Sequence, residues 1–363
     1  MSTRKTHIDI YLDTVANDER PVYLSGTFND WGEADSQFQM TQIGQHSYHY
    51  RLDLNGNFPH YYRYHKGDWN QEELDQWGNV SPGRLIDVTT YEVHDFVPRW
   101  RINGLATSVR FMPQKFIIED DFVIPQLDKR RRVWALVPCD YHRTKKRYPV
   151  LYLQDAQNLF NEHAPFGNWA IDQKLGILKE LGFGDLIIIA IEHGGSDRIK
   201  EYSPFDTDKF GSGEGALYAK FIIETLKPYV DRKFRSEPHR IHSGIGGSSM
   251  GGLISVYTAM NYPDVFSKWM IFSPSLWLSS QIFREARDFE NNEPSFVYLY
   301  GGKNESSSME KELKLFTEIL QRKAINNRFI HYKLSIDPVA THNEAFWGAE
   351  FPRAVKWLYF DQD

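Results

Sequence analysis

A short, wholly apolar run at residues 186–191 (LIIIAI) is the feature that most constrains the fold of this chain. Apolar side chains on both faces of so short a segment indicate a strand that is buried on both sides, as in a parallel sheet covered by helices. The run is far shorter than the roughly 18 residues that a membrane-spanning helix needs. Strand-like and helical segments alternate along the rest of the chain, which predicts an α/β domain with a mostly parallel sheet and helices on both faces.

The expected strands of this domain are short and apolar, and the expected helices lie between them. The strands are expected at residues 131–137, 148–153, 185–192, 240–245, 268–272, 296–300 and 328–336. The helices are expected at residues 169–181, 215–230, 249–261, 307–322 and 344–359. Residues 101–119 lack a clean period and are predicted to form a linker, so the α/β domain is expected to span residues 120–363.

The first hundred residues have the pattern of a separate all-β domain, in agreement with a length of 363 residues, which favours two domains. Ile8, Ile10 and Leu12 alternate with polar neighbours, which is the period of a half-buried strand. Short segments rich in Tyr and Val follow, with turn formers such as Asn29-Asp30 between them. An antiparallel, immunoglobulin-like sandwich is therefore expected at residues 1–100.

Composition excludes several classes of partner and site. The 42 basic and 48 acidic residues give a net charge of −6, whereas a nucleic-acid-binding protein normally has a basic excess. A single cysteine, Cys139, excludes an internal disulfide and a Cys-rich zinc site. No apolar run follows the basic residues of the N-terminus, so we expect no secretory signal, no membrane partner and a cytoplasmic location. Oligomeric state cannot be read from these features.

The strongest chemical signal is the segment Gly247-Ser248-Ser249-Met250-Gly251, a G-x-S-x-G motif between an expected strand and an expected helix. In this setting the motif is typical of a sharp turn that lifts a serine hydroxyl above the sheet as a nucleophile. Glycines on either side relieve the crowding of the turn. The sequence therefore predicts Ser249 as the nucleophile and the backbone N–H of Met250 as one donor to an oxyanion.

A serine nucleophile needs a base and an acid, expected here in the chain order Ser, acid, His. Of the two histidines after Ser249, His331 lies within an expected strand and His342 in the loop that follows it. Loops at the carboxyl ends of strands carry the functional residues of open α/β sheets, so His342 is the predicted base. Glu305 is the first carboxylate after the preceding strand and is favoured as the acid, with Asp337 as its competitor.

The second oxyanion donor is expected in the loop after the strand YPVLYLQ, at residues 155–160. The backbone N–H of Ala156, or that of its neighbour Asp155, is the predicted donor.

These residues resemble the esterase D and enterochelin-esterase-like branch of the α/β-hydrolases over residues 120–360. The resemblance runs, in order, through YPVLYLQDAQNLF, NWAIDQKL, IEHGGSDRIKEYSPF, YAKFIIETLKPYVDRKFR, GGSSMGGLISVYTAMNYPDVFSKWMIFSPSLWL and HNEAFWGAEFPRAVKWL. It implies an α/β-hydrolase fold and a serine esterase without metal or cofactor, with the acid on the GGKNE turn. Asp155, Trp277 and Trp347 lie in these segments and are expected to contact substrate. One departure is Ala156, where the family usually has a glycine; if that position needs a positive φ, alanine would disturb the oxyanion loop.

The N-terminal segments VYLSGTFNDWGE and YYRYHKGDW resemble glycogen- and starch-binding β-sandwich modules. The resemblance implies that Trp31 and Trp69, with Trp77 nearby, could stack on sugar rings, because a tryptophan face is broad and apolar. The alternative is that these tryptophans pack within the protein, and this alternative is favoured.

The sequence therefore predicts a serine hydrolase of carboxylic esters that acts through an acyl-enzyme. Its substrate is expected to be a small-molecule or saccharide ester, with siderophore, feruloyl, acetyl-polysaccharide and aryl esters all open. Two other functions also stay open: acyl transfer or thioester hydrolysis on the same fold, and carbohydrate binding with the hydrolase domain as a scaffold.

Overall fold

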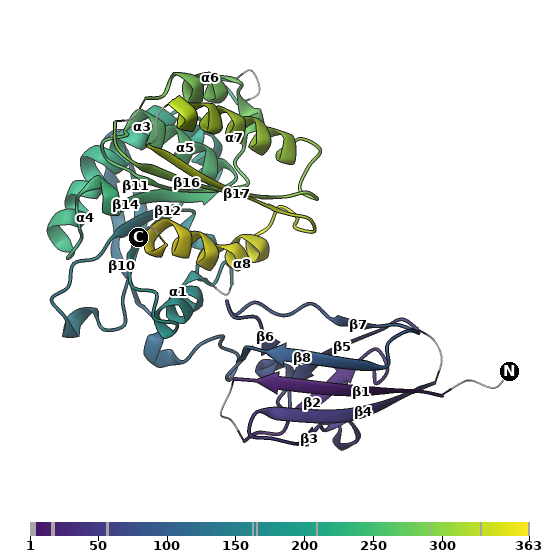
Figure 1. The fold of residues 1–363 in the computed structure, drawn as a ribbon. Coiled ribbons are helices and arrows are strands. Elements are labelled where there is room, and N and C mark those ends of the chain that lie inside the picture. Colours follow the sequence, from purple (N-terminus) through teal and green to yellow (C-terminus); the bar gives the residue numbers. More distant parts are fainter. Residues whose placement is uncertain are drawn as a thin grey trace. The chain divides into compact units, whose positions relative to one another are not determined.

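The computed structural model describes residues 5–15, 19–55, 58–161, 163–164, 166–207, 210–290, 292–326 and 329–361. The chain divides into two compact units, residues 1–109 and 110–363 (Figure 1). The expected linker, residues 101–119, spans this division, but its last six residues already belong to the sheet of the second unit.

The second unit is built on an eight-stranded sheet with the order β10-β11-β13-β12-β14-β15-β16-β17. The six strands β12 to β17 are parallel, and β10 and β11 pair antiparallel at one edge, so the predicted mostly parallel sheet is confirmed. The strands are β10 (Gln114–Ile124), β11 (Lys129–Val137), β12 (Val150–Gln154), β13 (Ile187–Ile191), β14 (Ser243–Ser248), β15 (Lys268–Phe272), β16 (Ser295–Gly302) and β17 (Ile330–Asp337). Arg328, where the last strand is expected to begin, lies outside the described residues.

Strand β10 is the main departure from the expected elements. It is an edge strand with two irregularities in its pairing to β11, and most of its side chains are exposed. Bulges and exposure both remove the regular alternation by which a strand is recognised in a sequence.

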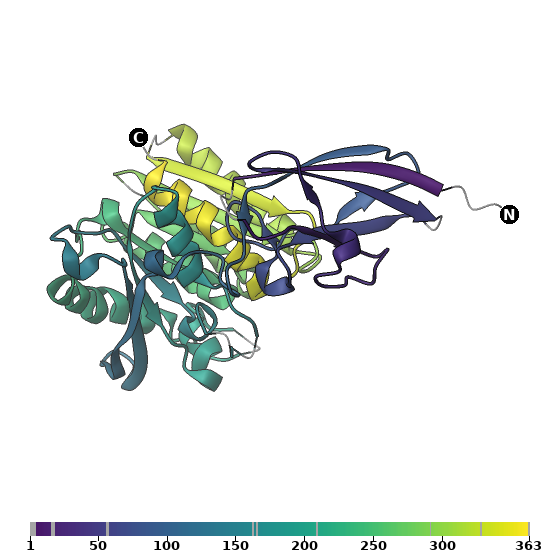
Figure 2. The ribbon, with the colours of Figure 1, turned by 90° about the horizontal axis from the view of Figure 1, so that it is seen from below.

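Helices cover both faces of the sheet. Helices α1 and α8 pack together on one face, and α5, α6 and α7 pack on the other (Figure 1). Figure 2, seen from below, shows α8 in yellow across its face of the sheet. The helices are α1 (Ile171–Glu180), α2 (Arg198–Tyr202), α3 (Gly215–Lys220), α4 (Lys227–Lys233), α5 (Met250–Asn261), α6 (Gln281–Asp288), α7 (Met309–Asn326) and α8 (Glu344–Val355), with π-helical segments at Phe221–Leu226 and Lys356–Phe360.

The core of this unit lies on both sides of the sheet, as the apolar run predicts. All five residues of β13 are fully buried. Ile187 and Ile189 join a cluster that includes Leu253 of α5. On the opposite face, the Trp169 ring stacks on Phe272 with 5.4 Å between ring centroids. A sheet buried on both faces is rigid, and it presents its loops at fixed positions.

The first unit consists of small sheets with the orders β3-β4-β1-β8, β2-β5-β7 and β6-β9. Side chains of its two larger sheets, among them Ile8, Ile10, Leu24 and Tyr64, form one apolar cluster. Its strands are β1 (Lys5–Thr14), β2 (Tyr23–Gly26), β3 (Thr41–Gln42), β4 (Ser47–Asn55), β5 (His60–His65), β6 (Glu73–Leu74), β7 (Arg84–Ile86), β8 (Glu92–Val97) and β9 (Arg99–Trp100). These sheets support the predicted all-β unit, although β1 and β8 pair parallel rather than antiparallel. The immunoglobulin-like topology stays a prediction.

The three tryptophans considered as possible sugar contacts differ in how far they are exposed. Trp77 is 8% exposed and has no open face for a sugar ring. Trp31 and Trp69 are half-buried, with 6.0 Å between their ring centroids. The guanidinium of Arg63 lies 5.5 Å from the Trp31 ring and 4.9 Å from the Trp69 ring. Glycan binding by these two residues stays a prediction, and their packing against each other and Arg63 favours the structural alternative.

Candidate active site

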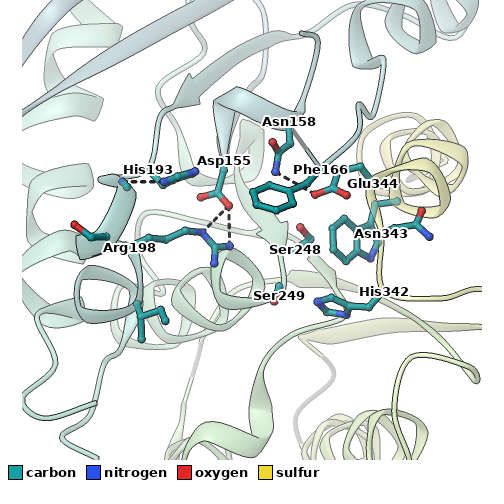
Figure 3. Close-up of a pocket in the computed structure, with 14 residues that line it drawn as sticks. Asp155, Asn158, Phe166, His193, Arg198, Ser248, Ser249, His342, Asn343 and Glu344 are labelled. Carbon is teal, nitrogen blue, oxygen red and sulfur yellow. Dashed lines mark hydrogen bonds and ion pairs between the residues drawn. The ribbon is translucent and has the colours of Figure 1, made fainter. Parts of the chain in front are cut away.

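A cleft of about 540 Å³ lies at the carboxyl ends of the parallel strands (Figure 3). Its walls come from the loops after β12, β13, β14 and β17, all within the second unit. Ten of its lining residues are labelled in Figure 3: Asp155, Asn158, Phe166, His193, Arg198, Ser248, Ser249, His342, Asn343 and Glu344.

Ser249 occupies the tight turn between β14 and α5. Its backbone has φ 57° and ψ −121°, a conformation that non-glycine residues rarely adopt. The turn is held by three backbone hydrogen bonds of 3.0 Å: Ser249 N–H donates to Phe272 O, and Ser249 O accepts from the N–H groups of Leu253 and Ser275. Such strain persists only where the surroundings enforce it, and it is common at catalytic residues.

The side chain of Ser249 is half-buried at the floor of the cleft. Its Oγ lies 3.4 Å from the Oγ of Ser275. His342 lines the same cleft beside it (Figure 3).

The two predicted oxyanion donors lie in different kinds of turn. Met250 is the first residue of α5, where a backbone N–H has no intrahelical acceptor. Ala156 begins the 3-10 turn Ala156–Asn158 and is 1% exposed. Ala156 is not among the described non-glycine residues with positive φ, so this position does not require the glycine that the family usually has.

A buried carboxylate orients His342. The Nδ1 of His342 lies 2.7 Å from Oε2 of Glu305, whose side chain is 1% exposed. The other oxygen, Oε1, accepts hydrogen bonds from the hydroxyl of Ser273 at 2.7 Å and from the N–H of Gly302. With both oxygens engaged, Glu305 holds one orientation, and a proton on His342 Nδ1 leaves Nε2 as the free acceptor.

The competing residues have other partners. Oδ1 of Asp337 accepts the backbone N–H groups of Val339 and Ala340 at 2.9 and 3.0 Å, and Oδ2 lies 3.5 Å from the hydroxyl of Tyr300. His331 lies within β17, where its ring stacks on Phe296 with 4.8 Å between centroids. The structure therefore brings Glu305, not Asp337, to His342.

One wall of the cleft carries an ion pair that the sequence motifs do not predict. Arg198 donates to Oδ2 of Asp155 from Nε at 2.8 Å and from a terminal nitrogen at 2.7 Å. Burial lowers the pKa of Arg198, but the charge and hydrogen bond of Asp155, together with the nearby Tyr202 and Glu344, outweigh burial and raise the pKa above its ordinary value. Arg198 thus holds Asp155, which is one of the predicted substrate contacts. Arg198 itself lies in the segment IEHGGSDR, which carries part of the family resemblance.

The oxyanion loop is tied to the same neighbouring loop. The Gln157 side chain accepts the N–H of His193 at 3.0 Å and donates to its carbonyl at 3.2 Å. The sequence motifs do not predict a place in the site for His193 either. Burial lowers its pKa, and its Nδ1 accepts the N–H of Gly195 at 2.9 Å.

The two tryptophans predicted to contact substrate lie in different places. Trp347 lines the cleft but is 4% exposed, and its ring stands perpendicular to the ring of His342 with 4.8 Å between centroids. Trp277 is 53% exposed and lies outside this cleft. The segments that carry the family resemblance cannot distinguish these cases, because they do not show which side chains face the cleft.

Three further residues line the cleft without a motif that predicts them. Phe166 is 72% exposed and lines the cleft (Figure 3). Asn158 donates to the carboxylate of Glu344 at 3.1 Å. Burial raises the pKa of Glu344.

Over the described ranges, no three His, Cys, Asp or Glu side chains gather as metal ligands would. Within the same ranges, no helix is both long and apolar enough to cross a bilayer.

Comparison with known proteins identifies the family. Residues 124–358, well over half of the chain, match the family described as "Putative esterase". The chain belongs to this esterase family. The predicted α/β-hydrolase fold of the second unit and the predicted esterase class are thereby confirmed.

Curated relatives match a large part of this esterase. It is 25% identical over 242 residues to the uncharacterized protein YbbA of Bacillus subtilis, covering 63% of this chain and 92% of YbbA. It is 26% identical over 199 residues to the ferri-bacillibactin esterase BesA of the same organism, covering 49% of this chain and 67% of BesA.

A solved structure shares the fold over nearly the whole chain. The enterobactin esterase FES of Shigella flexneri superposes with a TM-score of 0.55 at 14% identity, covering 97% of this chain and 92% of that one. At this identity the similarity shows the fold alone.

Proposed function

We propose that this esterase hydrolyses carboxylic esters through a triad of Ser249, His342 and Glu305 and an acyl-enzyme intermediate. The observation that carries the proposal is the 2.7 Å hydrogen bond from His342 to a buried Glu305, at a histidine that lines the same cleft as the serine of the strained turn. Nucleophile, base and orienting acid are the three parts that such a site needs.

In the first half of the reaction, Nε2 of His342 takes the proton of the Ser249 hydroxyl as Oγ attacks the ester carbonyl. The negative charge that develops on the carbonyl oxygen is stabilised by the N–H groups of Met250 and Ala156. Glu305 stabilises the imidazolium that forms. When the tetrahedral intermediate collapses, His342 returns the proton to the leaving alcohol, and the acyl group stays on Ser249.

In the second half, water takes the place of the alcohol. His342 removes a proton from the water as its oxygen attacks the acyl carbonyl, and the same two N–H groups stabilise the oxyanion. The carboxylic acid leaves and Ser249 regains its proton. No metal or cofactor enters either half.

For the substrate, we propose an ester with an aromatic acyl group, of the siderophore or feruloyl type. Phe166 supports this proposal, because its exposed ring at the cleft can stack on another ring. The relative BesA is named for a siderophore substrate. A panel that contains p-nitrophenyl esters of increasing chain length, methyl ferulate, acetylated xylan and a catecholate siderophore would rank the acyl groups by kcat/KM.

The nucleophile is tested by replacing Ser249 with Ala, with Ser248→Ala as the matched control. Ser249→Ala should lower kcat by on the order of 10⁴ or more and abolish labelling by a fluorophosphonate, because both require Oγ. The control should keep labelling and lose far less activity, because Ser248 ends β14 and is 7% exposed. Ester turnover at the wild-type rate by Ser249→Ala would refute the assignment.

A further inference from the structure

A chain of buried hydrogen bonds continues behind the carboxylate of Glu305. The indole N–H of Trp347 donates to Oγ of Ser273 at 2.8 Å, and the Ser273 hydroxyl donates to Oε1 of Glu305 at 2.7 Å. The opposite oxygen of that carboxylate faces His342 Nδ1, also at 2.7 Å. Trp347 is thus linked to both members of the proposed Glu305–His342 pair. It reaches Glu305 through the hydroxyl of Ser273, and its ring packs directly against the ring of His342.

The direction of this chain is set by chemistry. An indole N–H can only donate, so it occupies a lone pair of Ser273 Oγ. The single hydroxyl proton of Ser273 is then directed to the carboxylate, which is a strong acceptor. Each member therefore restricts the orientation of the next.

Ser273 itself is held in an unusual backbone conformation. It follows β15 with φ 42°, is fully buried, and its N–H donates to the carbonyl of Tyr300 at 2.7 Å. A positive φ in a buried non-glycine residue is costly, and such strain is concentrated at functional sites. At this position the hydroxyl reaches both Trp347 on α8 and Glu305 after β16.

We infer that Ser273 and Trp347 are positioning residues that orient Glu305 toward His342. The inference rests on the proposed triad and adds two residues that act through Glu305 and His342: Ser273 is fully buried, and Trp347 lines the cleft but is only 4% exposed. Their loss should therefore act on the chemical step and not on substrate binding.

The experiment compares Ser273→Ala, Trp347→Phe and their double variant by steady-state kinetics. Ser273→Ala should lower kcat by about 10- to 100-fold, the range expected for one hydrogen bond to a charged group, with KM changed by less than about twofold. Trp347→Phe keeps a ring beside His342 and should lower kcat by about three- to tenfold. The kcat of the double variant should lie within about twofold of the kcat of Ser273→Ala, because the indole acts through the Ser273 hydroxyl.

Tyr298→Phe is the matched control for a purely structural effect. The Tyr298 hydroxyl makes a buried 2.7 Å hydrogen bond from β16 to Glu350 on α8, the helix that carries Trp347, and does not contact Glu305. This control should lower the melting temperature as Trp347→Phe does, but keep kcat. The far-downfield NMR resonance of the His342 Nδ1 proton should shift in Ser273→Ala and Trp347→Phe and stay in place in Tyr298→Phe.

The outcomes separate this inference from the triad on which it rests. If Glu305→Gln is strongly impaired while Ser273→Ala and Trp347→Phe keep wild-type kcat and resonance, the positioning role is wrong and the triad stands. If Tyr298→Phe loses as much kcat as Trp347→Phe, the effect is structural and the inference is also wrong. If Glu305→Gln keeps full activity, both the proposed triad and the positioning role are wrong. If Ser273→Ala does not fold, the kcat and the His342 Nδ1 proton resonance of Trp347→Phe test the positioning role instead.

Discussion

At the residue scale, Glu305 and Asp337 differ in what their oxygens contact. Glu305 meets His342 through one oxygen, while Asp337 caps two backbone N–H groups of its own loop. Glu305→Gln should therefore lower kcat by on the order of 10²–10⁴ with little change in KM, as for other triad acids. Asp337→Asn should lose less than about tenfold.

Steady-state kinetics on one activated ester would test both variants together. The reverse order of effects would make Asp337 the acid, and it would require the loop at residues 337–342 to rearrange in solution.

At the element scale, the two glycines of the motif around Ser249 are not equivalent. A Cβ on Gly247 would lie 2.9 Å from the carbonyl oxygen of Gln154 and from the carbonyl carbon of Gly251, whereas a Cβ on Gly251 would meet only ordinary contacts from 3.4 Å. Gly247→Ala should thus destabilise the fold by roughly 1–3 kcal/mol, the usual cost of overpacking, and disturb the turn that carries Ser249.

Gly251→Ala is the paired comparison and should cost less than about 1 kcal/mol. Urea unfolding followed by fluorescence would measure both variants. If both variants lose the same free energy of unfolding, the close contacts at Gly247 do not explain the effect.

Strand β5 contains a histidine, His65, whose protonation burial disfavours. Nδ1 of His65 accepts the N–H of Gly67 at 3.2 Å, and Nε2 lies 2.8 Å from the hydroxyl of Ser25. Burial lowers the pKa of His65 from its ordinary 6.5. Below pH 6.5 the unfolded chain therefore binds more protons at this site than the folded chain, and stability falls as the pH drops.

Replacing His65 with Gln should make the stability of the fold less dependent on pH. The comparison is the midpoint of urea unfolding at pH 7 and pH 5 in the wild type and in His65→Gln. A variant whose midpoint falls as steeply as that of the wild type would assign the effect to other groups.

At the scale of the whole molecule, each unit has its own core, and every residue that lines the cleft belongs to the second unit. A chain of residues 110–363 should therefore fold and hydrolyse p-nitrophenyl acetate with kcat within about tenfold of the full chain. Circular dichroism and kinetics on this fragment would test it. A larger loss in a folded fragment would show that the first unit contributes to the active site.

Much of the molecule is determined by local pattern. The apolar run at residues 186–191 indicates a strand buried on both faces, and it is the buried strand β13. Ser249, with glycines two residues away on either side and a strand and a helix around it, lies in a turn that the local G-x-S-x-G pattern predicts, although Phe272 and Ser275 also help to hold its backbone. The family resemblance rests on such local segments in their order along the chain, and these segments suffice to predict the esterase class.

Other features depend on contacts between distant segments, which no local pattern records. Glu305 and Asp337 both follow strands, and only the packing of their loops brings Glu305 to His342. Arg198 pairs with Asp155 across 43 positions of sequence, and Trp347 reaches Ser273 across 74. The edge strand β10 has no regular period, because its pairing with β11 and not burial defines it. Tertiary packing alone decides these features, because they depend on which side chains meet and not on which side chains are adjacent in sequence.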